Sequence, residues 1–409
     1  MTIRFSLIYP TRHRPIFIKH ALLFLENQKY QDFEVIVSDN YSDPNLSCKV
    51  ECEKSDVKNL KYICPPKPVG MVENWNYALQ FATGDYICYL TDKMFLLPHT
   101  LSQASIAIEK ESPEIVTWID NSYSPSEYPD YFGSGYYYVG RSMVPLSHKY
   151  LFYDPLEELS KKGRADCSRS EQTRSNYARG KICFGAYSAL LCERIIHKSG
   201  NLFHNMSPDY SSMILALSWA TSALELSSPG FVHINTDLSN GGQAQQNDQF
   251  ALSYIKSLEK NELILDQLLI PSLYSSANNL VAHDYLLLKN KFNLEFEFDK
   301  INWLVYITED LNFPDKIWSS LNTKEKHLNL LHEYLENFLP ETEKLEYLAR
   351  VKARTQAKKN IQRKAIKKIL KLIIPNAFLC YCKEKRNAVR GILKCSAINE
   401  ILINHKNSI

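Results

Sequence analysis

Short apolar segments alternate with amphipathic segments over the first 120 residues of the chain. Helical spacing of apolar residues occurs over 15–25, 72–82 and 98–111. Strand-like runs rich in β-branched and aromatic residues lie before and between these segments, at 3–9, 33–38, 60–64, 85–90 and 115–119. Buried strands that alternate with helices are typical of a parallel sheet with helices on both faces. We therefore predict an α/β fold built on a mainly parallel, Rossmann-like sheet.

Polar residues follow three of these strand-like segments. Thr11 comes after the first segment, Asp39 and Asn40 after the second, and Asp92 and Lys93 after the fourth. In open parallel sheets, ligands bind beside the carboxyl ends of the strands. A single aspartate at a strand end is often only a loop cap, but three polar clusters in register predict a ligand site at this edge.

The pattern changes beyond residue 120. Tyr- and Gly-containing stretches over 121–180 show little periodicity, which predicts an insertion with loops, where the acceptor would be recognised. Regular signals return at 182–196 and 210–226, and leucine-rich helical patterns dominate afterwards. We predict four parts of the chain: a domain over 1–240 with halves 1–120 and 121–240, a helical region over 250–345, and a basic tail over 346–409.

Basic residues are concentrated in that tail. The chain of 409 residues has a net charge of +3, yet 350–371 contains ten Lys/Arg and no Asp/Glu. Apolar residues recur every four positions from Ile361 to Ile373. Such a basic amphipathic helix predicts that residues 350–382 bind an anionic membrane surface. The alternative is a helix packed on the protein with a solvated basic face. No nucleic-acid partner is expected, since no recognised binding module accompanies the charge.

Cysteines and apolar segments indicate the compartment. Ten cysteines are scattered without paired CxxC motifs of zinc spacing, which favours a reducing compartment over a disulfide framework. The N-terminal residues contain no long apolar core, and the sequence has no run of about 20 apolar residues. We expect a cytoplasmic protein that is peripheral at the inner face of the plasma membrane.

Two segments carry specific motifs. Residues 6–43 contain SLIYPTRHRP and QKYQDFEVIVSDNYSD, and residues 68–98 are PVGMVENWNYALQFATGDYICYLTDKMFLLP. Both resemble blocks of family 2 glycosyltransferases of bacterial polysaccharide and lipopolysaccharide biosynthesis, whose second block ends at a D-x-D motif. The resemblance covers residues 1–120, with a weaker extension to about 240. It implies a GT-A fold in which 1–120 bind a nucleotide-sugar and 121–240 bind the acceptor.

The resemblance also implies roles for individual residues. Pro10 and Thr11 correspond to contacts with the nucleotide base. Asp39 corresponds to the carboxylate that accepts a hydrogen bond from a uracil imide N–H, which favours a UDP-sugar. The whole implied donor-binding set follows the matching motif positions: Pro10, Thr11, Arg14, Asp39, Asn74, Asp92 and Lys93.

Sugar transfer requires a base that takes the proton of the acceptor hydroxyl. It also requires positive charge beside the departing diphosphate. The resemblance implies that Asp209 is this base in an inverting reaction. Taken without the resemblance, an aspartate between Pro208 and an apolar helix is typical of a helix cap. Asp166 and Asp237 are the alternative bases.

The sequence departs from the family pattern directly after Asp92. Relatives carry a second acid there that binds Mn²⁺ or Mg²⁺, whereas this chain has Lys93 and Met94, which supply no oxygen ligand. Three interpretations stay open: Asp92 holds a metal already clamped by the diphosphate, Lys93 replaces the metal, or activity is lost. Lys93 pointing to solvent is the alternative to all three. His233 matches a late metal ligand of some relatives, although a lone histidine is more often structural.

Together these features predict an inverting glycosyltransferase of surface polysaccharide synthesis. It would move a sugar from a UDP-sugar to a hydroxyl of a glycan or lipid-linked acceptor. The substituted D-x-D motif favours one alternative, a non-catalytic nucleotide-sugar- or glycan-binding relative recruited to a membrane by its tail. The sequence has no Gly-rich phosphate loop after its first strand, which argues against nucleotidyltransferases and dinucleotide-dependent oxidoreductases.

Overall fold

Two compact units make up the structure, a computed structural model. One unit contains 1–236, 287–297 and 394–409, and the other contains 237–286 and 298–393. The predicted tail over 346–409 is therefore divided between the units. The residues that the structure describes are 2–127, 129–145, 147–165, 175–204, 206–238, 240–258, 261–370 and 392–406.

An eight-stranded sheet forms the centre of the first unit, in the order β3-β2-β1-β4-β10-β6-β11-β9. Strands β1 to β4 are parallel to their neighbours, and β10 and β9 run antiparallel to theirs. The α/β fold with a mainly parallel sheet is thus confirmed. The strands of this sheet are β1 (Phe5–Thr11), β2 (Phe33–Asp39), β3 (Leu60–Ile63), β4 (Tyr86–Tyr89), β6 (Ile115–Thr117), β9 (Tyr150–Tyr153), β10 (Gly185–Ser188) and β11 (Ala223–Leu226).

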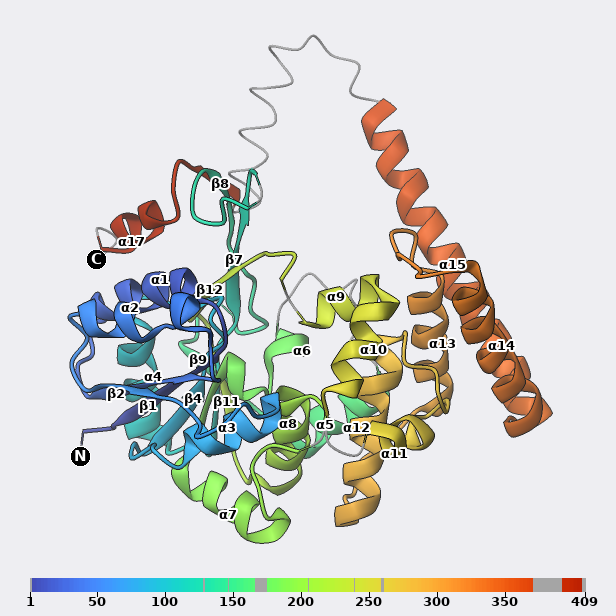
Figure 1. The fold of residues 1–409 in the computed structure, drawn as a ribbon, viewed down its shortest axis with the longest axis horizontal. Coiled ribbons are helices and arrows are strands. Elements are labelled where there is room, and N and C mark those ends of the chain that lie inside the picture. Colours follow the sequence, from blue (N-terminus) through green and yellow to red (C-terminus); the bar gives the residue numbers. More distant parts are fainter. Residues whose placement is uncertain are drawn as a thin grey trace. The chain divides into compact units, whose positions relative to one another are not determined.

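Helices cover both faces of this sheet. Figure 1 shows α1 and α2 on one face of β1 and β2 and α3 on the other. Helix α1 begins at Pro15, where the fixed φ of proline suits a first helical turn, and it buries an apolar face that includes Phe17, Leu22 and Leu25. The helices of the first unit are α1 (Pro15–Glu26), α2 (Lys49–Lys54), α3 (Met71–Leu79), α4 (Thr100–Glu111), α5 (Pro155–Gly163), α6 (Ser175–Ala178), α7 (Ala189–Ser199) and α8 (Pro208–Trp219), with short 3-10 turns η1 (Pro44–Leu46) and η2 (Ile182–Phe184).

A second sheet contains strands from three distant parts of the sequence. Its order is β13-β8-β7-β12-β5, with β5 (Met94–Leu96), β7 (Asp120–Pro125), β8 (Gly135–Tyr138), β12 (Phe231–Ile234) and β13 (Ile392–Cys395). The predicted insertion over 121–180 contains strands β7, β8 and β9 and helix α5 together with its loops. Tyrosines favour strands, but the strands here are short and pair with partners far along the chain.

The C-terminal residues of the described chain pack in the first unit. Ile398, Ile401 and Leu402, from the start of α17 (Asn399–Lys406) and the turn before it, are buried. The backbone N–H of Ile398 donates to the carbonyl of Phe132 at 3.1 Å, and the Phe132 ring stacks on His20 of α1 with centroids 4.0 Å apart. Residues close to both ends of the sequence thus share one core.

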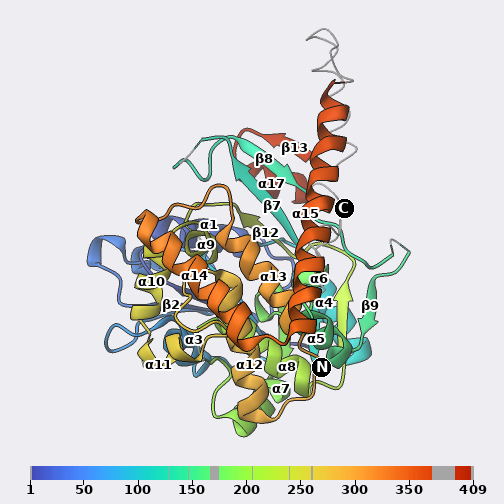
Figure 2. The same ribbon diagram turned by 90° about the vertical axis from the view of Figure 1, so that its right-hand side faces the viewer.

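The second unit is helical, in agreement with the predicted helical C-terminal region. Figure 2 shows the long helix α15 beside α13. No helix among the described residues is long and apolar enough to cross a membrane. The helices are α9 (Asn240–Gln246), α10 (Asp248–Lys256), α11 (Asn261–Gln267), α12 (Ala277–Phe292), whose last turns belong to the first unit, α13 (Lys300–Leu311), α14 (Leu321–Phe338) and α15 (Glu341–Leu370).

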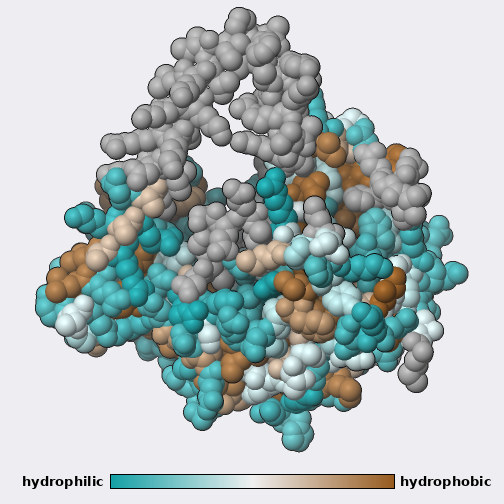
Figure 3. All heavy atoms as spheres, turned by 180° about the vertical axis from the view of Figure 1, so that it is seen from behind, coloured by the Kyte–Doolittle hydropathy of each residue, from teal (hydrophilic) through white to brown (hydrophobic). Residues whose placement is uncertain are grey.

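Hydrophobic residues on the surface occur in separate groups. Figure 3 shows them among hydrophilic residues on one face of the molecule. Scattered exposed apolar side chains are ordinary for a folded protein. The seven described cysteines are all free thiols, and Cys167, Cys380 and Cys382 lie outside the described residues.

Candidate functional site

The carboxyl ends of β1 and β2 bring the first predicted site residues together. Thr11 is paired with Asp39 in the parallel register of these strands, and the backbone N–H of Asn40 donates to the carbonyl of Thr11 at 2.8 Å. The Thr11 hydroxyl also donates to Oδ2 of Asp92 at 3.2 Å. Pro10 lies one position before Thr11, opposite Ser38. The polar clusters after three strands therefore meet at one edge, as predicted.

Asp39 is fully buried and organises the loop that follows β2. Its Oδ1 accepts a hydrogen bond from the Ser42 hydroxyl. Its Oδ2 accepts from the Cys48 backbone N–H at 2.9 Å and from the hydroxyls of Ser47 and Tyr62 at 3.1 Å each. Each carboxylate oxygen has about two acceptor positions, so these donors fill Oδ2 and leave one position at Oδ1.

Asn74 supports the same strand end from the opposite face of the sheet. It is buried in the first turns of α3 and accepts a hydrogen bond from the Ser38 hydroxyl at 2.8 Å. Asn40 performs a similar task, since its side chain donates to the Val69 carbonyl at 2.8 Å and accepts from the Val69 N–H at 3.2 Å. The predicted donor-binding residue Asn74 thus has a structural partner within the protein.

Positive charge surrounds Asp92. Burial raises the pKa of this carboxyl, while Arg14, Lys93 and the Thr11 hydroxyl each lower it, and the pKa remains above its usual value. Burial likewise lowers the pKa of Lys93, which Asp92 raises and Arg14 lowers further. Lys93 is half-buried and interacts electrostatically with both groups, which disagrees with a side chain that simply points to solvent.

His233 lies beside this loop. It pairs with Met94 across β12 and β5, and the next backbone N–H, of Ile234, donates to the Lys93 carbonyl at 2.9 Å. Within the described ranges, however, no three His, Cys, Asp or Glu side chains are grouped closely enough to hold a metal ion. Divalent Mg²⁺ and Ca²⁺ take several oxygen ligands, and Asp92 has two cationic neighbours instead. The described side chains around Asp92 therefore offer a divalent ion no cluster of protein ligands.

Asp209 lies in the first turn of α8 and is not its N-cap, which is Ser207. The Asp209 Oδ2 accepts a hydrogen bond from Nζ of Lys181 at 3.3 Å. The Lys181 side chain is only 2% exposed, whereas that of Asp209 is 31% exposed. Burial lowers the pKa of Lys181, but the rings of Tyr177 and Tyr210 and the Asp209 carboxylate outweigh burial and hold it above its usual range.

Sequence reasoning missed Lys181 and its aromatic neighbours. A single lysine directly before the apolar stretch ICFGAYSALL was the available signal, but no local pattern connects it to a residue 28 positions away. Of the alternative bases, Asp237 is exposed and belongs to the second unit. Asp166 lies outside the described residues.

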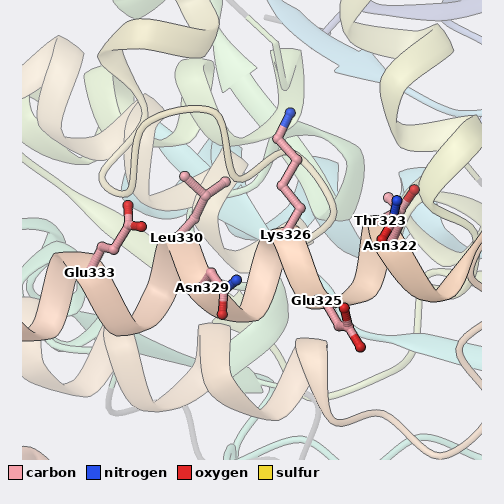
Figure 4. Close-up of a pocket in the computed structure, with 7 residues that line it drawn as sticks. All are labelled: Asn322, Thr323, Glu325, Lys326, Asn329, Leu330 and Glu333. Atoms are coloured by element: carbon pink, nitrogen blue, oxygen red, sulfur yellow. The ribbon is translucent and has the colours of Figure 1, made fainter.

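A hollow in the second unit lacks such an arrangement. All of its lining residues come from one face of α14, and Figure 4 shows their side chains along this single helix. The lining is polar except for Leu330. One exposed helix face does not bring groups from several elements together, so the candidate site is the strand edge of the first unit.

The sequence of the first unit is similar to a known family. Residues 6–155 match the family model described as glycosyl transferase family 2. A curated relative is 31% identical over 100 residues, which are 24% of this chain and 32% of the relative. That relative is named GalNAc(5)-diNAcBac-PP-undecaprenol beta-1,3-glucosyltransferase and comes from Campylobacter jejuni subsp. jejuni serotype O:2. The match thus spans about a third of the relative's length.

The chain also aligns with solved structures at low sequence identity. Residues 1–349 of TarS from S. aureus in complex with UDP-GlcNAc are 15% identical, with a TM-score of 0.44 over 87% of this chain and 92% of that chain. The mannosyltransferase PcManGT of Pyrobaculum calidifontis in complex with GDP-Man and Mn²⁺ is 14% identical, with a TM-score of 0.41 over 87% of each chain.

Proposed function

We propose that this chain is an inverting glycosyltransferase of glycosyl transferase family 2, the family whose model matches residues 6–155. It moves a sugar from a UDP-sugar to a hydroxyl of a glycan or lipid-linked acceptor in surface polysaccharide synthesis. The observation that carries the proposal lies inside the family segment. Thr11, Asp39 and Asp92 meet at the carboxyl edge of a parallel sheet, where open α/β sheets bind nucleotides.

The donor's nucleotide binds at the ends of β1 and β2. Pro10 and Thr11 contact the base, and Asp39 accepts a hydrogen bond from the uracil imide N–H. Since Oδ2 of Asp39 already has three donors and Oδ1 has one, Oδ1 is the oxygen with room for this bond. Asn74 supports this site from the opposite face of the sheet, because it accepts a hydrogen bond from Ser38 at the end of β2.

The departing diphosphate is stabilised by Arg14 and Lys93. Both cations interact with Asp92, and a fixed positive charge where negative charge develops lowers the barrier to transfer. A guanidinium and an ammonium also form strong charge-assisted hydrogen bonds with phosphate oxygens. The family is compatible with a divalent ion, but these residues favour transfer without one.

Asp209 is the base in this proposal. It stands in the first turn of α8 with part of its carboxylate exposed, so it can take the proton of an acceptor hydroxyl. The hydroxyl oxygen then bonds to the anomeric carbon from the side opposite the diphosphate, and the bond to the diphosphate breaks. One carboxylate is sufficient for this inverting step.

The acceptor is proposed to be lipid-linked. The curated relative's name describes transfer to an undecaprenol-linked glycan. An anionic membrane surface is the proposed partner of residues 350–382, which would keep a cytoplasmic enzyme at the inner face of the membrane. Two of the basic residues, Arg350 and Arg354, form ion pairs with Asp299 and Glu309. The remaining positive charges of the segment therefore carry this proposal, and residues 371–382 lie outside the described chain.

The test is UDP release by the purified protein from UDP-glucose and UDP-N-acetylglucosamine, with and without glycan acceptors. We expect Asp209→Asn to lower turnover by roughly 100-fold or more while UDP binding survives. An active Asp209→Asn protein would move the base elsewhere. A wild-type protein that binds UDP-sugars but never releases UDP would favour the non-catalytic binding module.

A further inference from the structure

The ammonium of Lys181 is enclosed by one carboxylate and two aromatic rings. Its Nζ lies 3.9 Å from the centroid of the Tyr177 ring and 3.8 Å from that of Tyr210. Asp209 Oδ2 is 3.3 Å away. Aromatic faces attract cations, and more so in a site without water. Two elements, α6 and α8, therefore converge on the charge of Lys181, the residue before η2.

The burial of this ion pair is the reverse of the usual order. Lysines on protein surfaces extend so that the charged end reaches water, but here the lysine is 2% exposed and the carboxylate 31%. The buried pair Lys162–Glu158 in the same unit is different, since both side chains are buried, at 5% and 3%. In the Lys181–Asp209 pair the cation is enclosed, and the carboxylate stays accessible to solvent.

The two oxygens of Asp209 have different surroundings. Oδ2 accepts from Lys181, while no hydrogen bond to Oδ1 is found within the described ranges. A carboxylate held at one oxygen by a fixed cation presents the other oxygen in a defined direction.

We propose that Lys181 is the positioning residue for the base: it holds Oδ2 of Asp209 so that Oδ1 receives the acceptor proton. This inference rests on the proposed function. During transfer the acceptor O–H bond breaks as its oxygen bonds to the anomeric carbon. The bond between the anomeric carbon and the diphosphate breaks at the same time, and its electron pair leaves with the diphosphate. The proton moves to Oδ1, while Lys181 keeps its own proton. The pair changes from neutral to a net charge of +1.

The test compares Lys181→Met, Lys181→Gln and Lys181→Arg by UDP release from UDP-glucose and UDP-N-acetylglucosamine across pH. We expect Met and Gln to lower kcat about tenfold or more, with KM for the donor within about twofold. The acid limb of their pH profiles moves to higher pH, because a fixed positive charge beside the base is lost. Arg keeps the charge and therefore keeps the wild-type acid limb.

Lys162→Met is the matched control, since it removes an equally buried ammonium that is paired with Glu158. It is expected to lower thermal stability and leave the acid limb unchanged. Thermal unfolding identifies which Lys181 variants are folded. One folded variant, Lys181→Met or Lys181→Gln, is sufficient to decide whether Lys181 positions the base. If that variant has the kcat and the acid limb of wild type while Asp209→Asn is inactive, the positioning role of Lys181 is overturned and the assignment of Asp209 as the base stands. An active Asp209→Asn protein would instead overturn the assignment of the base on which the inference rests.

Discussion

Single side chains at the strand edge combine structural and proposed binding tasks. Asp39 holds the loop after β2 by accepting hydrogen bonds from Ser47, Cys48 and Tyr62. The same carboxylate is the proposed partner of the nucleotide base of the donor. A substitution there affects both the loop and the ligand. Variants that separate these effects are therefore more informative than deletion of the carboxylate alone.

We expect Asp39→Ala to weaken UDP binding by about 1–3 kcal/mol, because a buried polar group of the ligand loses its partner. Isothermal titration measures the affinity, with thermal unfolding recorded in parallel. Tyr62→Phe is the matched control, since it removes one donor to Asp39 and keeps the carboxylate. UDP affinity within about twofold of wild type is expected for it. An Asp39→Ala protein that folds and binds UDP as tightly as wild type would refute the assignment.

Lys93 allows a test of metal dependence. We expect wild-type UDP release to persist in EDTA, and Lys93→Met to reduce it about tenfold or more, because the diphosphate loses a fixed cation. Lys93→Asp should be inactive in EDTA and partly restored by millimolar Mn²⁺, since it supplies a second oxygen ligand beside Asp92. The exposed Lys67→Met serves as control. Wild-type activity abolished by EDTA and rescued by Mn²⁺ would show that Lys93 does not replace a metal.

At the scale of secondary structure, β2 contains a charged residue inside the sheet. Glu34 is fully buried and accepts hydrogen bonds from Ser6 at 2.7 Å, Lys61 at 2.8 Å and the Thr83 backbone at 2.6 Å. Burial raises its pKa, but these partners lower it more, and its pKa is about 2. The side chain joins β1, β2, β3 and the loop before β4.

Glu34 therefore predicts acid sensitivity of the first unit. Its folded pKa is below the unfolded value, so its contribution is complete above about pH 4.5 and is lost as the pH falls toward 2. The shift corresponds to about 3 kcal/mol at neutral pH. We expect Glu34→Gln to lower the free energy of unfolding by about that amount at pH 7, measured by urea unfolding. The difference from wild type should shrink over this pH window.

Glu53→Gln is the control for this experiment. Glu53 is 62% exposed and pairs with Lys49 at 3.8 Å, and exposed pairs contribute up to about 1 kcal/mol. It should leave the pH dependence unchanged. A stability difference for Glu34→Gln that stays constant from pH 7 to pH 2 would contradict the linkage.

The elements that the sequence predicted well are those with local signals. Strands β1, β2 and β4 are mainly apolar segments with polar residues at or soon after their ends, and Pro15 marks the start of α1. Strand β5 has three residues and pairs with β12, more than 130 positions later. Contacts at such separations leave no periodicity in a local window. The Lys181–Asp209 pair was missed for the same reason.

At the scale of the whole molecule, the basic segment does not form a free end. Residues 394–409 cluster with the first unit, and Ile398 and Ile401 are buried there. Deleting everything from residue 345 onward would remove core residues together with the basic charges. Membrane attachment is therefore better tested by neutralising charges than by truncation.

We expect the full chain to pellet with anionic liposomes at low salt and to be released as salt rises, because screening weakens surface attraction. A combined variant should no longer pellet at low salt when six basic residues are replaced together by Gln: Lys358, Lys359, Arg363, Lys364, Lys367 and Lys368. Vesicles of phosphatidylcholine, which have no net charge, provide the control. Equal pelleting of the substituted and wild-type chains would refute membrane attachment through these charges.

The return of residues 394–402 to the first unit has a consequence for synthesis. These residues leave the ribosome after nearly all the rest of the described chain. At about 5–20 residues per second, they follow β8 by roughly 13 to 51 s. Strand β8, which lies next to β13 in the finished sheet, remains an open edge during that interval, and open edges recruit other strands. The nascent protein is therefore most exposed to aggregation while its second unit is still being translated.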